Sequence, residues 1–100
     1  MTNPVPSFLT HKDGDYVAVA VKDVGRGPAE VGFLDGSPTV TVEVNAEIPL
    51  GHKVALRDVA EGEDVIEYGV RVAIASAEIT KGDYVHIHNV RSARWQNSVA

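Results

Sequence analysis

The sequence predicts an all-β domain that is compact and irregular, with at most short helical turns near residues 56–60 and 76–79. Apolar and polar residues alternate along several segments, as expected for strands whose successive side chains point to opposite faces. Glycine and aspartate are concentrated between these segments, which is typical of tight turns. No long segment shows the three- and four-residue apolar spacing of an amphipathic helix. Many short strands without helical crossovers indicate a β architecture.

Four segments between residues 16 and 75 are predicted to form strands. Tyr16 to Val21 is apolar on both faces, so it should be a central strand with a close neighbour over its alanines. In Thr39 to Val44 the valines share one face and the polar residues share the other, which predicts one buried face. Lys53 to Arg57 and Val70 to Ala75 alternate in the same way, and we expect both to be half-buried.

One turn pattern occurs three times. Ile48 to Val54, Val59 to Val65 and Ile79 to Val85 each contain a branched apolar residue, two residues, a glycine, two residues and a valine. This pattern predicts a structural corner in which an anchoring side chain is followed by a turn and a strand that re-enters the core. Asp13 and Asp15 flank another glycine turn, where short carboxylates are expected to accept hydrogen bonds from turn N–H groups.

The composition limits the possible functions. The chain has 100 residues, 9 Lys plus Arg and 14 Asp plus Glu, which gives a formal net charge of −5. We expect one domain over residues 8–90, with an N-terminal tail over 1–7 and a C-terminal tail over 91–100. The absence of cysteine excludes a disulfide framework, a thiol nucleophile and an iron–sulfur cluster.

Charge and hydropathy also predict where the protein works. The acidic balance is unfavourable for nucleic-acid binding, which depends on clustered Lys and Arg. No apolar run approaches the ~20 residues of a membrane span, and the first ten residues do not resemble a signal peptide. We therefore expect a cytoplasmic protein without a membrane or nucleic-acid partner. The C-terminal tail carries Arg91, Arg94 and Trp95, and it is either a solvated tail or a segment that docks on a partner.

The histidines are the clearest candidates for chemistry. His86 and His88 would share one face of a strand, with their Cα atoms about 6.6 Å apart, and could converge on one cation. Two ligands do not complete a metal site, and a third could be His52 or His11. The alternative is an exposed polar face without a ligand. Tyr84 lies on the same predicted face, where its ring would cover the sheet edge.

Three ordered motifs resemble the N-terminal domain of altronate and galactarate dehydratases. They are Ile48 to Leu56, Val65 to Gly69 and Gly82 to Val90. An upstream segment over residues 11–23 resembles the opening of that family, although Tyr16 stands where the family has Asn. The resemblance covers roughly residues 8–90.

This resemblance implies a fold, an activity and a partner. The fold would be the β-clip of SAF, or antifreeze-like, domains. Enzymes of the family remove water from polyhydroxy sugar acids to give 2-keto-3-deoxy acids, with iron or another divalent cation, and Fe²⁺ is the cofactor that the resemblance favours. The chain would be the small subunit of a two-chain lyase, with a large dehydratase-type chain as its partner. A related possibility is the small subunit of sulfolactate sulfo-lyase, which expels sulfite from a sulfonated 2-hydroxy acid.

The resemblance also raises specific residues as candidates. The expected catalytic residues are His52, His86 and His88, the tentative metal ligands are His86 and His88, and the expected substrate contacts are Lys53, Tyr68 and His11. A neutral imidazole can ligate a metal, and a protonated one can donate a hydrogen bond. Two alternatives remain open: a non-catalytic module that binds sugar acids or assists assembly, and a subunit that only stabilises its partner.

Overall fold

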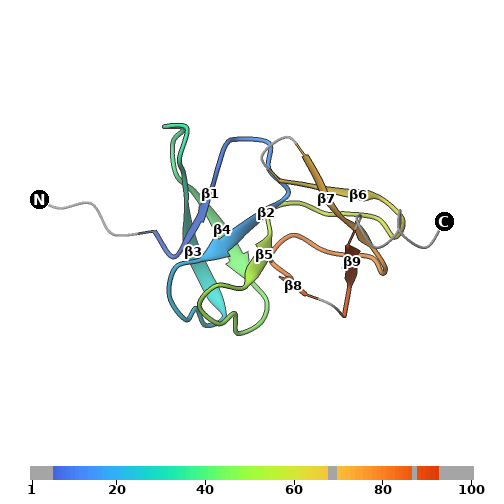
Figure 1. Cartoon of the computed structure of the whole chain (residues 1–100). Coiled ribbons are helices and arrows are strands. Elements are labelled where there is room, and N and C mark those ends of the chain that lie inside the picture. The colour runs from blue at the N-terminus through green and yellow to red at the C-terminus, as the bar shows by residue number, and fades with distance from the viewer. Residues whose placement is uncertain (1–5, 68–69, 87, 93–100) are drawn as a thin grey trace, which may run out of the picture.

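The protein folds into two β-sheets, as seen in a computed structural model that describes residues 6–67, 70–86 and 88–92 (Figure 1). The strands of the larger sheet are β1 (Phe8–Thr10), β2 (Val17–Ala20), β3 (Gly27–Phe33), β4 (Val40–Val44), β5 (Lys53–Ala55) and β8 (Tyr84–Val85). The strands of the smaller sheet are β6 (Asp64–Glu67), β7 (Val70–Ala75) and β9 (Val90–Ser92). Because no helix occurs in the described ranges, the prediction of an all-β fold is confirmed.

The order of the strands differs from their order in the chain. The larger sheet runs β4-β3-β1-β2-β5-β8 and the smaller one runs β6-β7-β9. All pairings are antiparallel except that of β1 with β3. The larger sheet lies toward the N-terminal side of the molecule and the smaller sheet toward the C-terminal side (Figure 1). The backbone of Tyr16, just before β2, bridges the two sheets, because its N–H donates to Ile66 of β6 over 2.7 Å.

Strand β2 is central, as its two apolar faces predict. It lies between β1 and β5 in the larger sheet. Ala18 and Ala20 pack into one core cluster with Phe8 and Val54, while Val17 points into a second cluster with Val65. Since successive strand residues face opposite sides, one strand supplies both clusters. The expected close neighbour over the alanines is present.

The three predicted corners form as expected. Gly51, Gly62 and Gly82 all have positive φ, at 85°, 86° and 94°. Glycine suits these positions because it has no Cβ to clash in the left-handed region. The anchors and the re-entering valines are all buried: Ile48, Val59, Ile79, Val54, Val65 and Val85.

The expected helical turns near residues 56–60 and 76–79 do not form. Each segment instead contributes one residue to an isolated antiparallel bridge between Val59 and Ile79. The N–H of each residue donates to the carbonyl of the other over 2.8 Å. These backbone groups are committed to a strand-like pairing, so they cannot make the local bonds of a helical turn.

The C-terminal residues lie partly outside the described ranges. Strand β9 places Arg91 opposite Ile74 of β7, so sheet pairing continues past the expected domain end at residue 90. Arg94 and Trp95 lie outside the described residues, and the expected tail boundaries stay a prediction. Within the described ranges, the structure has no helix of the length and apolarity needed to cross a membrane.

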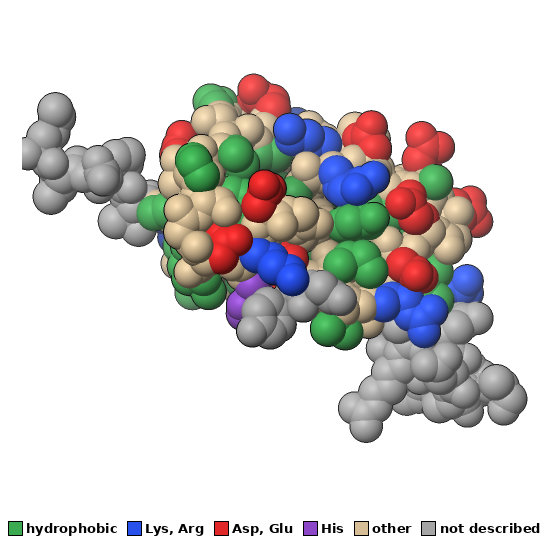
Figure 2. Space-filling view, turned by 90° about the horizontal axis from the view of Figure 1, so that it is seen from above, with side chains coloured by type: hydrophobic (Ala, Val, Ile, Leu, Met, Phe, Trp, Pro, Cys, Tyr) green, Lys and Arg blue, Asp and Glu red, His purple; other side chains and the backbone are tan. Residues whose placement is uncertain are grey.

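Charges are mixed on the surface. On the face shown in Figure 2, basic and acidic side chains are interspersed, with apolar side chains between them.

In the loop between β3 and β4, hydrogen bonds from Ser37 hold the pKa of the Asp35 carboxyl below its ordinary value. This carboxylate stabilises the turn at Gly36, because the Ser37 N–H donates to it over 2.9 Å.

Candidate functional site

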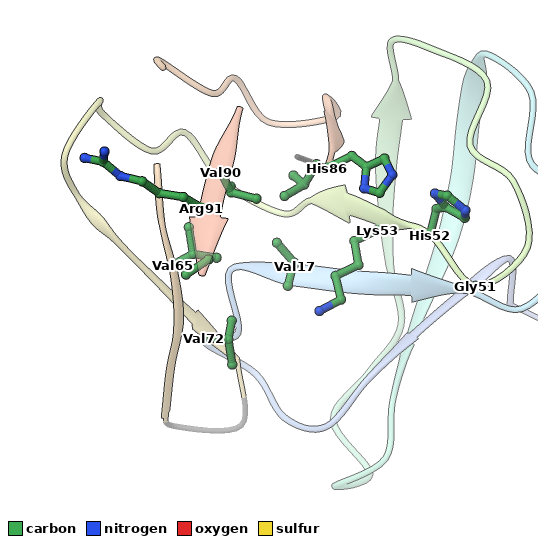
Figure 3. A pocket seen from close by; sticks show the side chains of 11 residues that line it. Val17, Gly51, His52, Lys53, Val65, Val72, His86, Val90 and Arg91 are labelled. Atoms are coloured by element: carbon green, nitrogen blue, oxygen red, sulfur yellow. The ribbon is translucent and has the colours of Figure 1, made fainter. Parts of the chain in front are cut away.

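An open groove with a volume of about 700 Å³ lies between the two sheets. One part of it is apolar, with Val17 from β2, Val65 from β6, Val72 from β7 and Val90 from β9. In Figure 3 these valines gather in the middle of the groove, between the two labelled histidines on one side and Arg91 on the other. Residues of both sheets therefore line the groove, and we call its four valines the valine floor.

Strand register places the polar end of the groove. In the β2–β5 pair Val19 lies opposite Lys53, and in the β5–β8 pair Lys53 lies opposite Val85. One further residue along the second register brings His52 beside His86. Their ring centroids are 5.0 Å apart at an interplanar angle of 75°. Histidines that are 34 positions apart in the sequence therefore face one another at the edge of the groove, as Figure 3 shows.

Tyr84 contacts three histidines at this end of the groove. Its hydroxyl lies 2.5 Å from Nδ1 of His52. Its ring stacks on that of His86, with centroids 5.5 Å apart and an angle of 24°. The ring of His88 approaches the same tyrosine with a centroid distance of 5.7 Å. We call His52, Tyr84, His86 and His88 the histidine–tyrosine cluster.

The prediction that His86 and His88 share one face of a strand is wrong. Strand β8 ends at Val85, and His86 and His88 lie in a bend and a turn. The physical reason is Asn89, which is buried and folds the chain back. Its Oδ1 accepts the His86 N–H over 3.0 Å, and its Nδ2 donates to the Tyr84 carbonyl over 2.9 Å. The rings of both histidines nevertheless lie beside the Tyr84 ring, at centroid distances of 5.5 and 5.7 Å.

Lys53 supplies positive charge beside the cluster. Its Nζ lies 3.1 Å from Oε1 of Glu67, and the Lys53 side chain remains 39% exposed while that of Glu67 is 14% exposed. A partly exposed ion pair of this kind contributes little to stability, at most about 1 kcal/mol. An anionic ligand could therefore compete with Glu67 for the ammonium group.

The sequence matches the SAF domain of altronate and galactarate dehydratases over residues 6–93. The chain belongs to this SAF-domain family. The expected resemblance is thereby confirmed, and the two curled sheets agree with the β-clip fold that it implied.

Curated relatives within the family are named as lyases and dehydratases. The α subunit of (2R)-sulfolactate sulfo-lyase from Chromohalobacter salexigens is 41% identical over 90 residues, which cover 88% of this chain and 96% of the relative. Altronate dehydratase from Escherichia coli is 42% identical over 78 residues, which cover 78% of this chain but 15% of the relative. Galactarate dehydratase from the same organism is 34% identical over 82 residues, which cover 82% of this chain and 14% of the relative.

The structure brings together only some of the residues that the sequence and the SAF resemblance suggested. His52, Lys53 and His86 line the groove, and His88 joins the cluster through Tyr84. His11 follows β1, and the β1–β2 and β2–β5 registers put it at the opposite end of β2 from His52. Its backbone N–H donates to a buried carboxylate there. Tyr68 lies outside the described residues, so its role as a substrate contact stays a prediction.

The described residues of the SAF domain do not by themselves form a site for a divalent cation. Among the described residues, no group of three or more His, Asp or Glu side chains is arranged to hold a metal ion. One nitrogen of His52 already faces the Tyr84 hydroxyl. The cluster therefore does not fit a metal site of its own. The assignment of His86 and His88 as metal ligands stays a prediction.

Reasoning from the sequence missed or misplaced three contributors to the site. Tyr84 was expected only to cover the sheet edge, although its parity with His86 was a usable signal. No pattern in the sequence marks Asn89 as a buried residue that shapes the turn. Arg91 lines the groove from β9, whereas the sequence placed it in the tail.

Proposed function

We propose that this chain is the small subunit of a two-chain lyase that eliminates a β-substituent from a 2-hydroxy carboxylate, with (2R)-sulfolactate as the first candidate substrate. The observation that carries this proposal is the match to a sulfo-lyase α subunit, which covers almost the whole relative at 41% identity. The partner would be a large lyase chain. The name "subunit alpha" supports this, since it implies at least one other kind of subunit in the relative.

The chemistry requires a base, a leaving group and stabilisation of negative charge. Removal of the proton from C2, next to the carboxylate, produces an enediolate-like charge. This electron pair forms a double bond between C2 and C3 while the C3–S bond breaks and sulfite leaves with the bonding pair. The resulting enol takes up a proton at C3, loses the proton of its C2 hydroxyl and so becomes a 2-oxo acid. In a sugar acid the group on C3 is a hydroxyl, which must gain a proton to leave as water.

The groove offers groups for these tasks. The ammonium of Lys53 suits the carboxylate or sulfonate of a doubly charged substrate. His52 and His86 stand at the same end, where imidazoles can donate or accept a proton. We assign catalytic roles to these two histidines, with His88 as a third candidate behind Tyr84. The valine floor would exclude water from the reacting carbons.

A complete site requires the large chain. The groove is open, and among the described residues its polar lining consists of His52, Lys53, His86 and Arg91, which is little for a substrate with two anionic groups and a hydroxyl. We therefore propose that the large chain closes the groove and supplies most ligands of the divalent cation, with Fe²⁺ as the cation that the family resemblance favours. When bound, such a cation stabilises the charge that develops on the substrate oxygens.

Dehydration of altronate or galactarate is the second candidate. It is favoured by 42% identity to the corresponding part of altronate dehydratase. The same SAF domain could accompany either leaving group, because the histidine–tyrosine cluster does not itself distinguish sulfite from water.

The test is to co-express this chain with the large lyase chain from the same genome and to assay the purified complex. Release of sulfite from (2R)-sulfolactate would support the first candidate, and formation of a 2-keto-3-deoxy acid from altronate or galactarate would support the second. We expect His52→Gln and His86→Gln to lower kcat about 100-fold, as for loss of a group that transfers a proton or stabilises developing charge, with thermal unfolding as the control for folding. A complex inactive on all three substrates would contradict the lyase proposal. Tight binding of a sugar acid by the chain alone would instead favour the non-catalytic module.

A further inference from the structure

The contact between Tyr84 and His52 restricts what His52 can do. The tyrosine hydroxyl of β8 faces Nδ1 of the imidazole at 2.5 Å, and His52 is the residue just before β5, the strand that pairs with β8. The tyrosine is itself held in place, since its backbone carbonyl accepts a hydrogen bond from Nδ2 of Asn89 and its ring stacks on that of His86. The hydroxyl therefore meets the histidine from a fixed direction.

The chemistry of the two groups decides which one donates. A phenol O–H is a stronger donor than the N–H of a neutral imidazole, and the unprotonated imidazole nitrogen is a stronger acceptor than a phenol oxygen. The favoured arrangement has Tyr84 donating to Nδ1 of His52. In a neutral imidazole the single ring proton then resides on Nε2.

We propose that Tyr84 is a positioning residue that holds His52 in the Nε2–H form, so that His52 donates a hydrogen bond to the substrate carboxylate instead of removing the C2 proton. This inference rests on the proposed lyase function and adds a division of labour to it. His86, whose ring lies 5.0 Å from that of His52, is then the group that takes up the proton.

The division of labour agrees with the surroundings of the two rings. His52 is half-buried and tied to the sheet through its backbone, because its carbonyl accepts the Ala20 N–H over 2.8 Å. A donor that stabilises developing charge works best when it is held rigidly. His86 is exposed, at the start of the turn closed by Asn89. An exposed imidazole can exchange its proton with solvent between turnovers.

The first arm of the test uses the full chain without a partner. Long-range ¹H–¹⁵N spectra of the ¹⁵N-labelled chain, recorded above neutral pH, report which imidazole nitrogen carries the proton, and His52→Gln assigns the signals. We expect His52 to be in the Nε2–H form, with Nδ1 showing the shift of a hydrogen-bond acceptor. In Tyr84→Phe, which keeps the ring that stacks on His86, we expect this shift to be lost and the Nδ1–H form to increase.

Tyr16→Phe is the matched control. Tyr16 is also half-buried, and its ring lies under the Arg57 guanidinium at 4.3 Å, away from the cluster in the contacts of the described residues. Its loss of a hydroxyl should leave the His52 signals unchanged. A His52 that carries its proton on Nδ1 in the unmodified chain would overturn the proposal, and so would signals that Tyr84→Phe does not alter.

The second arm uses the complex with the large chain. Tyr84→Phe should lower kcat about tenfold or more with a smaller change in KM, because a misaligned donor chiefly affects the transition state. Unchanged kcat in Tyr84→Phe would overturn the positioning role. Failure of the unmodified complex to act on any substrate would instead count against the proposed function, while the spectra still decide the state of His52.

Discussion

A Cβ atom on Gly82 would overlap the carbonyl oxygen of Glu43 in β4. Two backbone hydrogen bonds hold Gly82 in this position. Its N–H donates to the Ala55 carbonyl over 2.9 Å, and its own carbonyl accepts the Asn45 N–H over 3.0 Å. The corner at Gly82 therefore packs tightly between β5 and the end of β4. The residue that enters this space must have no side chain.

Gly82→Ala should therefore be severely destabilising. Alanine would suffer both from the positive φ of 94° and from a collision with backbone that cannot rotate away. We expect the free energy of unfolding to fall by about 3 kcal/mol or more, as measured by urea denaturation. The matched control is Gly36→Ala, where φ is 88° but a Cβ would meet no atom within 4 Å. That variant should lose only about 1 to 2 kcal/mol, and equal losses would show that the contact with Glu43 carries no cost.

Much of the fold could be predicted because it is encoded locally. The corner at Gly82 was predicted from spacing alone, since an anchor, a glycine and a valine must appear in order for the chain to turn and re-enter the core. The pairing of Val59 with Ile79 could not be predicted in the same way. It joins two corners that are 20 positions apart, so it depends on tertiary packing and not on local propensity. The expected helical turns were wrong for this reason.

Asn89→Ala should disturb both stability and the site. The asparagine side chain is buried and makes two hydrogen bonds, to the His86 N–H and the Tyr84 carbonyl. Their loss should reduce the free energy of unfolding by about 2 kcal/mol, measured by thermal or urea denaturation. Because the turn carries His86, kcat of the complex should fall as well.

Asn45→Ala provides the comparison for this variant. The Asn45 amide also makes a hydrogen bond, of 2.7 Å to Asp83, but it is exposed to solvent. We expect a loss below about 1 kcal/mol and no change in kcat, since water can replace this partner. If Asn89→Ala were as mild as Asn45→Ala, the buried asparagine would not be what shapes the turn.

Asp15→Ala should be costly although the residue lies in a turn. Oδ2 of this buried carboxylate accepts the Thr10 hydroxyl at 2.5 Å and the N–H groups of His11 and Lys12 at 3.1 and 3.3 Å. Hydrogen bonds to a charged group contribute more than neutral ones, and we expect a loss of about 2 to 3 kcal/mol in the free energy of unfolding. Asp13→Ala, at an exposed position of the same turn, should change stability by about 0.5 kcal/mol or less. A mild Asp15→Ala would mean that solvent replaces the carboxylate.

The candidate site was harder to predict than the fold. The sequence identified His52 and His86, and the family resemblance raised both, but only strand register puts one beside the other. Tyr84 was assigned a covering role because a lone aromatic at a sheet edge is usually part of the packing. Its hydrogen bond to His52 depends on side-chain direction across two strands, which alternation alone does not reveal.

Lys53→Gln separates a role in stability from a role in binding. The ion pair with Glu67 is partly exposed, so its removal should change the free energy of unfolding by about 1 kcal/mol or less. A charged hydrogen bond to the substrate would be worth about 1.5 to 3 kcal/mol, so KM of the complex should rise about 10- to 100-fold. Arg71→Gln is the matched control, because it breaks a different ion pair of the described residues, in which the Arg71 guanidinium lies 3.7 Å from Asp64. It should alter neither stability nor KM appreciably.

Glu67→Gln should have the opposite effect to Lys53→Gln and lower KM, since it removes the carboxylate that competes with the substrate for Lys53. Steady-state kinetics on all three variants would decide this, and an unchanged KM in both Lys53→Gln and Glu67→Gln would remove the pair from substrate binding.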